Sequence, residues 1–158
     1  MERADRRIAP PQGFDGLFDK LTEPLPGHAI AIFETRQKAM MFAAALGFSR
    51  RERVPVERRA TASAIRYEVF QVDSDEAFIS GLAVATTGDL RVLSPDRAAE
   101  RVTIFEEYAH AGLQHMQRVA VDQEGDPLDN LIRLTTEARA GSDAEIPGID
   151  RSVLGGLI

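Results

Sequence analysis

"SPDRAAERVTIFEEYAHAGLQHMQRVA", residues 94 to 120, is the stretch that decides the fold. Ser94 is suited to cap a helix, Pro95 fits the first helical position, and Asp96 places an acid in the first turn. Apolar residues then recur every three or four positions, which is helical spacing. They are Val102, Phe105, Tyr108 or Ala109, Gly112, Leu113, Met116 and Val119. The stretch therefore predicts the longest helix of the chain and the scaffold of the domain.

Four other segments carry helical signals. Phe14 to Leu21 has apolar residues at helical spacing, and prolines follow it. Thr35 can cap a second helix that ends at a C′ glycine, Gly47, and this helix has almost no polar face, so we expect it in the middle of the domain. A third helix starts at Ser74 and closes near Gly88, and a last one opens at Asp126 and ends in "AGSD".

One segment has the alternation of a β-strand. "AIRYEVFQV", residues 64–72, places Ile65, Tyr67 and Val69 on one face and charged residues on the other. Pairing with residues 54–56 would give a hairpin tipped by Arg58 and Arg59. We therefore expect a mainly α fold with about five helices around one core and a small two-stranded β-ribbon. The expected divisions are an irregular arm at 1–13, a single helical domain at 14–140, and an apolar tail at 141–158.

The tail, which ends in "AEIPGIDRSVLGGLI", is too rich in glycine and proline for a long helix. It is also too apolar for an ordinary solvated tail. We predict that it docks on protein, either by folding back on the domain or by binding elsewhere. The apolar residues that would make this contact are Ile146, Ile149, Val153, Leu154, Leu157 and Ile158.

Composition excludes several classes of protein. The chain has 158 residues, enough for one core, and contains no cysteine, which excludes disulfides, thiolate nucleophiles and cysteine-bound metals. Its amino terminus lacks the apolar core of a signal peptide, and no apolar run approaches the ~20 residues that span a bilayer. We expect a cytoplasmic protein without a membrane contact. A pI near 5.1 argues against wholesale coating of nucleic acid but allows a local basic patch.

Signals for catalysis are weak. The chain has three histidines and lacks a nucleophile elbow, a Walker phosphate loop and a dinucleotide-binding glycine motif. Glu107 and His110 reproduce half of a di-metal carboxylate signature, but no second Glu-x-x-His exists. An enzyme built around Glu106, Glu107 and His110 is the catalytic alternative. We expect no catalytic residue, no metal and no cofactor.

Arginines are concentrated in "GFSRRERVPVERR", residues 47–59, although the net charge of the chain is −6. On a loop or ribbon tip, guanidinium groups can bind phosphates or the carboxylates of a partner. They can equally pair with Glu52, Glu57 and nearby acids as a solvated face. No aromatic residue lies among them, so contact with a nucleic-acid backbone is favoured over base stacking. The candidate DNA- or partner-binding residues are Arg50, Arg51, Arg53, Arg58, Arg59 and Arg66.

Three phrases occur together in order: "IFETRQKAMMFAAALGFSRRERVPVE" at 32–57, "FISGLAVATTGDLRVLS" at 78–94 and "RVTIFEEYAHAGLQHM" at 101–116. Over residues 32–116 the chain thereby resembles the small proteins encoded alongside bacterial DNA phosphorothioation (Dnd) genes, the Dnd system-associated proteins. The resemblance implies an accessory of a system that replaces a non-bridging phosphate oxygen of DNA with sulfur, or that restricts DNA lacking this mark. It carries over no catalytic residues.

The expected function is that of a non-enzymatic accessory or adaptor in phosphorothioation-linked DNA modification or restriction, an antiviral defence. The arginine segment would contact duplex DNA or a protein subunit of the modification or restriction complex, such as a nuclease or ATPase. The alternative is a DNA-binding transcriptional regulator with a winged-helix-like ribbon at residues 54–72. Against it, only one helix lies between the short apolar stretch at residues 29–33 and the ribbon, whereas that architecture needs two in tandem.

Overall fold

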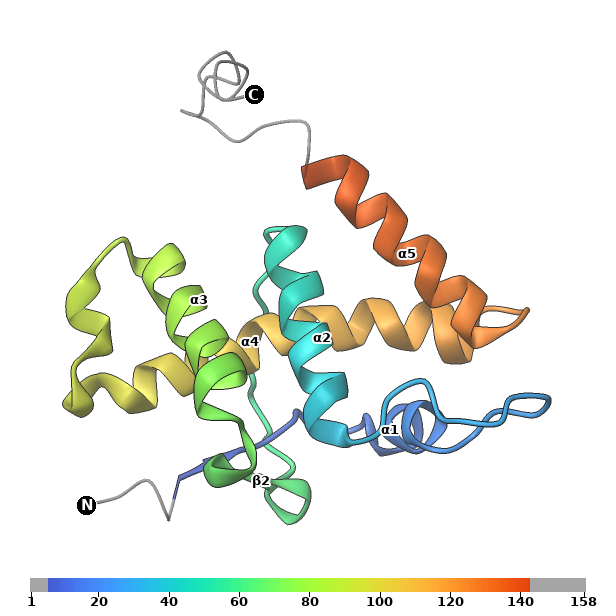
Figure 1. Ribbon diagram of the computed structural model, residues 1–158, viewed down its shortest axis with the longest axis horizontal. Coiled ribbons are helices and arrows are strands. Elements are labelled where there is room, and N and C mark those ends of the chain that lie inside the picture. Colours follow the sequence, from blue (N-terminus) through green and yellow to red (C-terminus); the bar gives the residue numbers. More distant parts are fainter. Residues whose placement is uncertain (1–5, 143–158) are drawn as a thin grey trace.

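The computed structural model describes residues 6–142, and within them it contains five α-helices and one two-stranded antiparallel sheet (Figure 1). This confirms the mainly α fold with a small ribbon. In chain order the elements are β1 (Arg7–Ile8), α1 (Asp15–Thr22), α2 (Arg36–Ser49), β2 (Ile65–Arg66), α3 (Ala77–Thr87), α4 (Ala98–Gln117) and α5 (Pro127–Ser142).

Helix α4 is the scaffold, as its length predicts. It runs across the molecule, α2 and α3 both cross it, and α5 turns back from its end (Figure 1). Most of its predicted apolar stripe is buried, including Phe105, Leu113 and Met116, which are fully enclosed. Two polar side chains of α4, Glu106 and His115, are also buried, and the periodicity did not reveal them.

Local signals place most helix ends correctly. Thr35 caps α2 by accepting a hydrogen bond from the Lys38 amide at 3.2 Å, and Gly88 ends α3 in the left-handed region. Asp126 caps α5 by accepting from the amides of Leu128 and Asp129. Ser94 behaves differently: it precedes a 3₁₀ turn, Pro95–Arg97, makes no side-chain capping bond, and α4 begins only at Ala98.

The prediction for Gly47 was wrong. Helix α2 continues through Gly47 to Ser49, because this glycine is needed for close packing and not for a turn. A Cβ atom on Gly47 would lie 2.1 Å from the carbonyl oxygen of Tyr108, and one on Gly112 would lie 1.9 Å from the carbonyl oxygen of Ala43. Helices α2 and α4 therefore meet backbone to backbone, each supplying one glycine.

The predicted partner of the ribbon strand was also wrong. Strand β2 pairs with β1, with Arg7 opposite Arg66 and Ile8 opposite Ile65, and it does not pair with residues 54–56. The pairing continues beyond the sheet, because the Gln12 amide donates to Arg58 O and an isolated bridge joins Pro11 to Arg59. Residues 7–11 of the expected irregular arm thus lie along the chain of residues 59–66, with Ile8 fully buried. Residues 54–72 form no hairpin and hence no wing.

The glycine contact gives a first prediction. Gly112→Ala should destabilise the protein by about 3 kcal/mol or more, because the new methyl group must separate two packed backbones. Gly81→Ala on α3 is the matched control, since a Cβ atom there meets nothing within 4 Å. This control should gain up to ~1 kcal/mol from helix propensity. Urea unfolding of the two variants checks both signs, and an unchanged midpoint for Gly112→Ala would contradict the packing.

Candidate anion-binding surface

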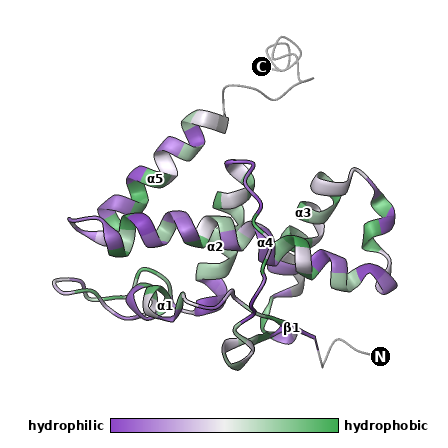
Figure 2. Ribbon diagram, turned by 180° about the vertical axis from the view of Figure 1, so that it is seen from behind, coloured by the Kyte–Doolittle hydropathy of each residue, from purple (hydrophilic) through white to green (hydrophobic). Residues whose placement is uncertain are grey.

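The part of the arginine segment that follows α2, residues 50–59, leaves this helix and passes over α4 (Figure 2). Arg51 has a φ of 56°, which turns the chain out of α2, and Pro55 prevents a further helix. The Val54 amide then donates to the carbonyl oxygen of Glu107 at 3.1 Å. The Nδ1 atom of His110 lies 3.0 Å from the carbonyl oxygen of Pro55. These contacts hold the segment against the middle of α4.

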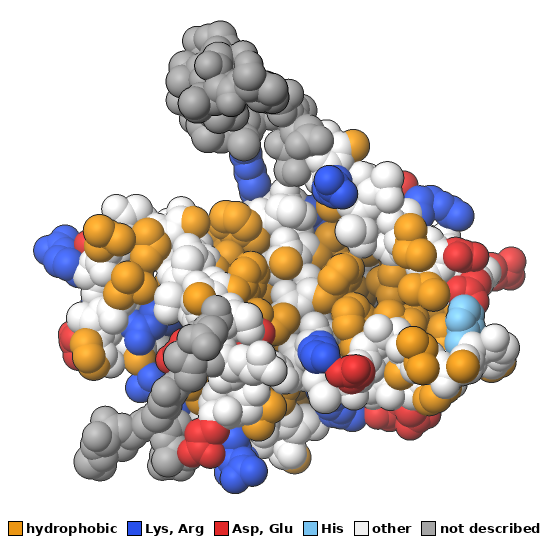
Figure 3. Space-filling model, viewed as in Figure 1, with side chains coloured by type: hydrophobic (Ala, Val, Ile, Leu, Met, Phe, Trp, Pro, Cys, Tyr) orange, Lys and Arg blue, Asp and Glu red, His pale blue; other side chains and the backbone are white. Residues whose placement is uncertain are grey.

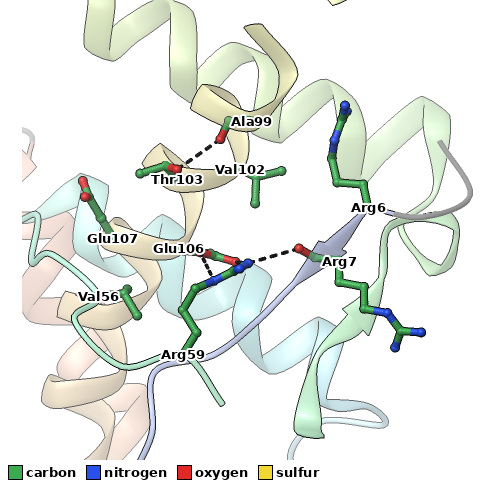
Figure 4. Close-up of a pocket in the computed structure, with 9 residues that line it drawn as sticks. All are labelled: Arg6, Arg7, Val56, Arg59, Ala99, Val102, Thr103, Glu106 and Glu107. Atoms are coloured by element: carbon green, nitrogen blue, oxygen red, sulfur yellow. Dashed lines mark hydrogen bonds and ion pairs between the residues drawn. The ribbon is translucent and has the colours of Figure 1, made fainter. Parts of the chain in front are cut away.

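The side chain of Glu106 is almost completely buried. It contacts both the arginine segment and the amino-terminal chain (Figure 4). The Arg59 guanidinium donates to both of its carboxylate oxygens, at 2.6 and 3.1 Å. The Ala9 amide donates to the same carboxylate at 2.7 Å, and Arg59 also reaches the carbonyl oxygen of Arg7 at 3.3 Å. A buried carboxylate requires such compensation. Glu106 therefore joins α4 to the arginine segment and to the amino-terminal chain.

Two more of the predicted arginines contact acids of the chain itself. Arg53 forms an ion pair with Glu107 and lies 6.0 Å from the centre of the Tyr108 ring. The Nε atom of Arg50 is 3.6 Å from Glu52, whose other carboxylate oxygen is 2.5 Å from His115 Nε2. The hydrogen bond with His115 lowers the pKa of the Glu52 carboxyl below its usual value. Arg50, Arg53 and Arg59 are thus each within ion-pair distance of an acid of the chain itself, and a role for them in binding DNA or a partner stays a prediction.

The catalytic alternative does not gain a site from this geometry. Glu106 binds Arg59, Glu107 binds Arg53, and His110 contacts the Pro55 carbonyl. Among the side chains that the structure describes, no three histidine, aspartate or glutamate residues are arranged to hold a metal ion.

Arg58 and Arg66 are exposed, and within the described residues no carboxylate pairs with either of them. Arg7 joins them. The Tyr67 amide bonds to the Arg6 carbonyl at 2.9 Å, so Arg7 and Arg66 form the next, non-hydrogen-bonded pair of the ladder, where side chains lie closest. Both face solvent, while Ile8 on the other face is fully buried. We name Arg7, Arg58 and Arg66 the ribbon arginines.

Sequence reasoning missed Arg7 because it lay in the presumed arm. A signal for it exists in the Arg-Ile order of residues 7 and 8, which mirrors the Ile-Arg order of residues 65 and 66. Two residues are too few to establish a strand pairing without the structure. A pocket of about 320 Å³ lies beside the ribbon (Figure 4). Its lining includes the charged residues Arg6, Arg7, Arg59, Glu106 and Glu107 and the apolar residues Val56 and Val102.

Two predictions from the sequence stay untested by the structure. Arg51 is exposed at the bend after α2, and its binding role stays a prediction. The tail residues Ile146, Ile149, Val153, Leu154, Leu157 and Ile158 lie outside the described residues, so the docking tail stays a prediction. In residues 6–142, no helix is both long and apolar enough to cross a membrane.

The buried carboxylate gives a second prediction. Glu106→Gln should destabilise the protein by about 3 kcal/mol, because the amide replaces one buried oxygen, which accepts hydrogen bonds, with an NH₂ group that faces other donors. Glu107→Gln should cost less than ~1 kcal/mol, because the Glu107 side chain is more exposed to water than that of Glu106. Urea unfolding measures both costs. Hydrogen exchange at the Ala9 amide should accelerate only in Glu106→Gln, and equal exchange in both variants would argue against the three-way contact.

Glu52 gives a third prediction, on pH. Its pKa is lower in the folded than in the unfolded chain, so the ionised carboxylate stabilises the fold above the unfolded pKa of about 4.3. That stabilisation disappears as the pH falls through the folded pKa. The urea midpoint of Glu52→Gln should therefore lie below that of the wild type at pH 7, and the gap should close as the pH falls through the folded pKa. A constant gap between them across this range would refute the assignment.

The comparison with known families comes last. A sequence profile described as DNA sulphur modification system-associated protein 4 matches residues 7–149. The match confirms the resemblance seen in residues 32–116 and extends it to both strands of the ribbon, including Arg7. No curated protein and no solved structure matches the chain. Because the profile covers most of the sequence, the chain belongs to the family of DNA sulphur modification system-associated protein 4.

Proposed function

We propose that this chain is a non-enzymatic accessory of a DNA sulphur modification system and that it contacts the phosphate backbone of DNA through the ribbon arginines. The observation that carries this proposal is the placement of Arg7 directly opposite Arg66, with no carboxylate paired to either within residues 6–142. Like charges at opposite positions of a ladder destabilise a sheet. An anion bound between them would remove that repulsion.

The geometry suits a phosphate backbone. A guanidinium group offers a planar fork of donors that matches phosphate oxygens. Arg58 lies across from Gln12, which is five residues along the chain from Arg7, and five extended residues span roughly 16 Å. Phosphates of one DNA strand rise by about 3.4 Å each, so this span faces several of them. The backbone positions of the three arginines therefore fit within one stretch of DNA backbone.

The ribbon is firmly attached on its inner side. Ile8 and Tyr67 are buried in the core, and the Ala9 amide is bound to Glu106. The Arg6 guanidinium lies over the Tyr67 ring at 5.9 Å from its centre. Since the backbone beneath the exposed charges is fixed, little freedom would be lost when DNA binds. With a net charge of −6, the rest of the molecule would repel nucleic acid and confine contact to this surface.

The role is proposed as non-enzymatic because the acids and the histidine nearest to the surface are already engaged. Glu106, Glu107 and His110 contact Arg59, Arg53 and Pro55 of the chain itself. A catalytic acid or base must instead reach a proton of the substrate. The family name supports association with DNA sulphur modification, and a role in restriction or antiviral defence belongs to the proposal.

The proposal predicts a specific loss of DNA binding. Fluorescence anisotropy of a labelled duplex, over a salt series, should give wild-type binding that weakens as salt rises. Arg7→Gln combined with Arg66→Gln should weaken binding at least about tenfold and reduce the log–log salt slope by roughly two, one unit per lost phosphate contact. The double variant should be at least as stable as the wild type, because the repulsion is relieved. Lost binding would then not reflect unfolding.

The matched control has the same change of net charge. Arg118→Gln combined with Arg133→Gln alters two exposed arginines at the other end of α4 and on α5, and it should leave binding nearly unchanged. Equal weakening by both pairs would mean that only net charge matters. Absence of duplex binding at low salt would overturn the DNA contact and favour an acidic subunit as the partner. A phosphorothioated duplex titrated in parallel shows whether the mark alters the affinity.

A further inference from the structure

An apolar groove lies between α5 and the chain that enters α2, and it shares no residue with the ribbon arginines. Its volume is about 540 Å³, and its walls include Ile32, Phe33 and Phe42 on one side and Leu128, Ile132 and Ala140 on the other. Figure 3 shows apolar side chains gathered over this area, between α5 and the loop that follows α1. Ile132 is 55% exposed.

Side-chain contacts hold the walls of the groove in place. At one end His28 contacts Asp126 at 2.8 Å, which ties the loop to the first turn of α5. The Phe33 and Phe42 rings pack with centres 5.3 Å apart and form the opposite wall. On α5, the hydroxyls of Thr135 and Thr136 donate to carbonyl oxygens of their own helix at 2.9 Å. The groove therefore presents apolar surface and requires few hydrogen bonds from an occupant.

We infer that the groove is occupied by the carboxyl-terminal segment of this same chain, residues 146–158. The segment supplies six large apolar residues, which match the chemistry of the walls. Its attachment is at the open end of the groove, because Ala140 lines the groove and α5 ends at Ser142.

The length of the segment is sufficient. From Ala140 back to Leu128 is twelve helical residues, or roughly 18 Å. An extended chain returning along α5 covers that distance in about six residues at ~3.3 Å each. Sixteen residues follow Ser142, so the segment can reverse and still place Ile149, Val153 and Leu154 along the groove. No other described part of the chain covers Ile132 or the groove face of α5.

Tethering makes the occupancy favourable even if the contact itself is weak. A short flexible connection gives an effective concentration on the order of 1 mM, so a segment with a dissociation constant of about 0.1 mM would fill its groove about nine-tenths of the time.

Paramagnetic relaxation on the full chain tests the inference. Because the protein has no cysteine, Ser152→Cys carries a nitroxide label at one position only. The amide signals of Ile32, Ile132 and Thr136 should be lost in the oxidised sample and recovered when the label is reduced. Adding Val153→Asp and Leu154→Asp to the labelled chain, or Ile132→Glu in the exposed wall, should restore these signals.

Mixing distinguishes the possible occupants. Chain that carries the nitroxide but no ¹⁵N is mixed with ¹⁵N chain that carries no nitroxide. The groove signals of the ¹⁵N chain should be unaffected. Their loss in the mixture would mean that the segment docks on a second copy, which overturns the intrachain arrangement. If the oxidised label leaves the groove signals unchanged, the inference is overturned. It is also overturned if the signals stay broadened both in the Val153→Asp, Leu154→Asp variant and in the Ile132→Glu variant.

Discussion

The backbone contact between α2 and α4 is the constraint on which the other features depend. Gly47 faces the carbonyl oxygen of Tyr108, and Gly112 faces that of Ala43, so neither helix can slide or rotate without a clash. The contact fixes the place where α2 ends, and hence the point at which the arginine segment begins to cross α4. Val54 then meets the backbone of Glu107, and Arg59 arrives at Glu106. A feature of packing thus determines which arginines meet which acids.

Glu106 divides the arginine cluster into two groups with different roles. It binds Arg59 and the Ala9 amide inside the protein, and its neighbour Glu107 takes Arg53, so these guanidinium charges hold segments of the fold together. The same contacts bring the amino-terminal chain beside β2, which places Arg7 opposite Arg66. The contacts of Glu106 therefore account both for the arginines that pair with acids inside the protein and for the exposed pair of Arg7 and Arg66. Counting arginines along the sequence could not separate the two groups.

The helices could be predicted from the sequence because their signals are local. Thr35, Gly88 and Asp126 each lie within a few residues of the groups that they cap. The errors concern contacts between distant residues. Gly47 suits a helix end and a close helix crossing equally well, and only Tyr108, far along the chain, decides between them. The partner of β2 was missed because two-residue strands carry no register information of their own.

The cost of the Arg7 and Arg66 pair is the strongest argument that the ribbon has a partner. Strand pairs usually avoid like charges at opposite positions, and a neutral residue at either position would relieve the repulsion without disturbing the buried face. Here the inner face, with Ile8 and the Glu106 contact, stabilises the ribbon enough for the repulsion to be tolerated. Stability alone gives no reason to keep both charges. Binding of an anion removes the repulsion between Arg7 and Arg66. The free energy of that repulsion in the free protein therefore adds to the affinity of the surface for the anion.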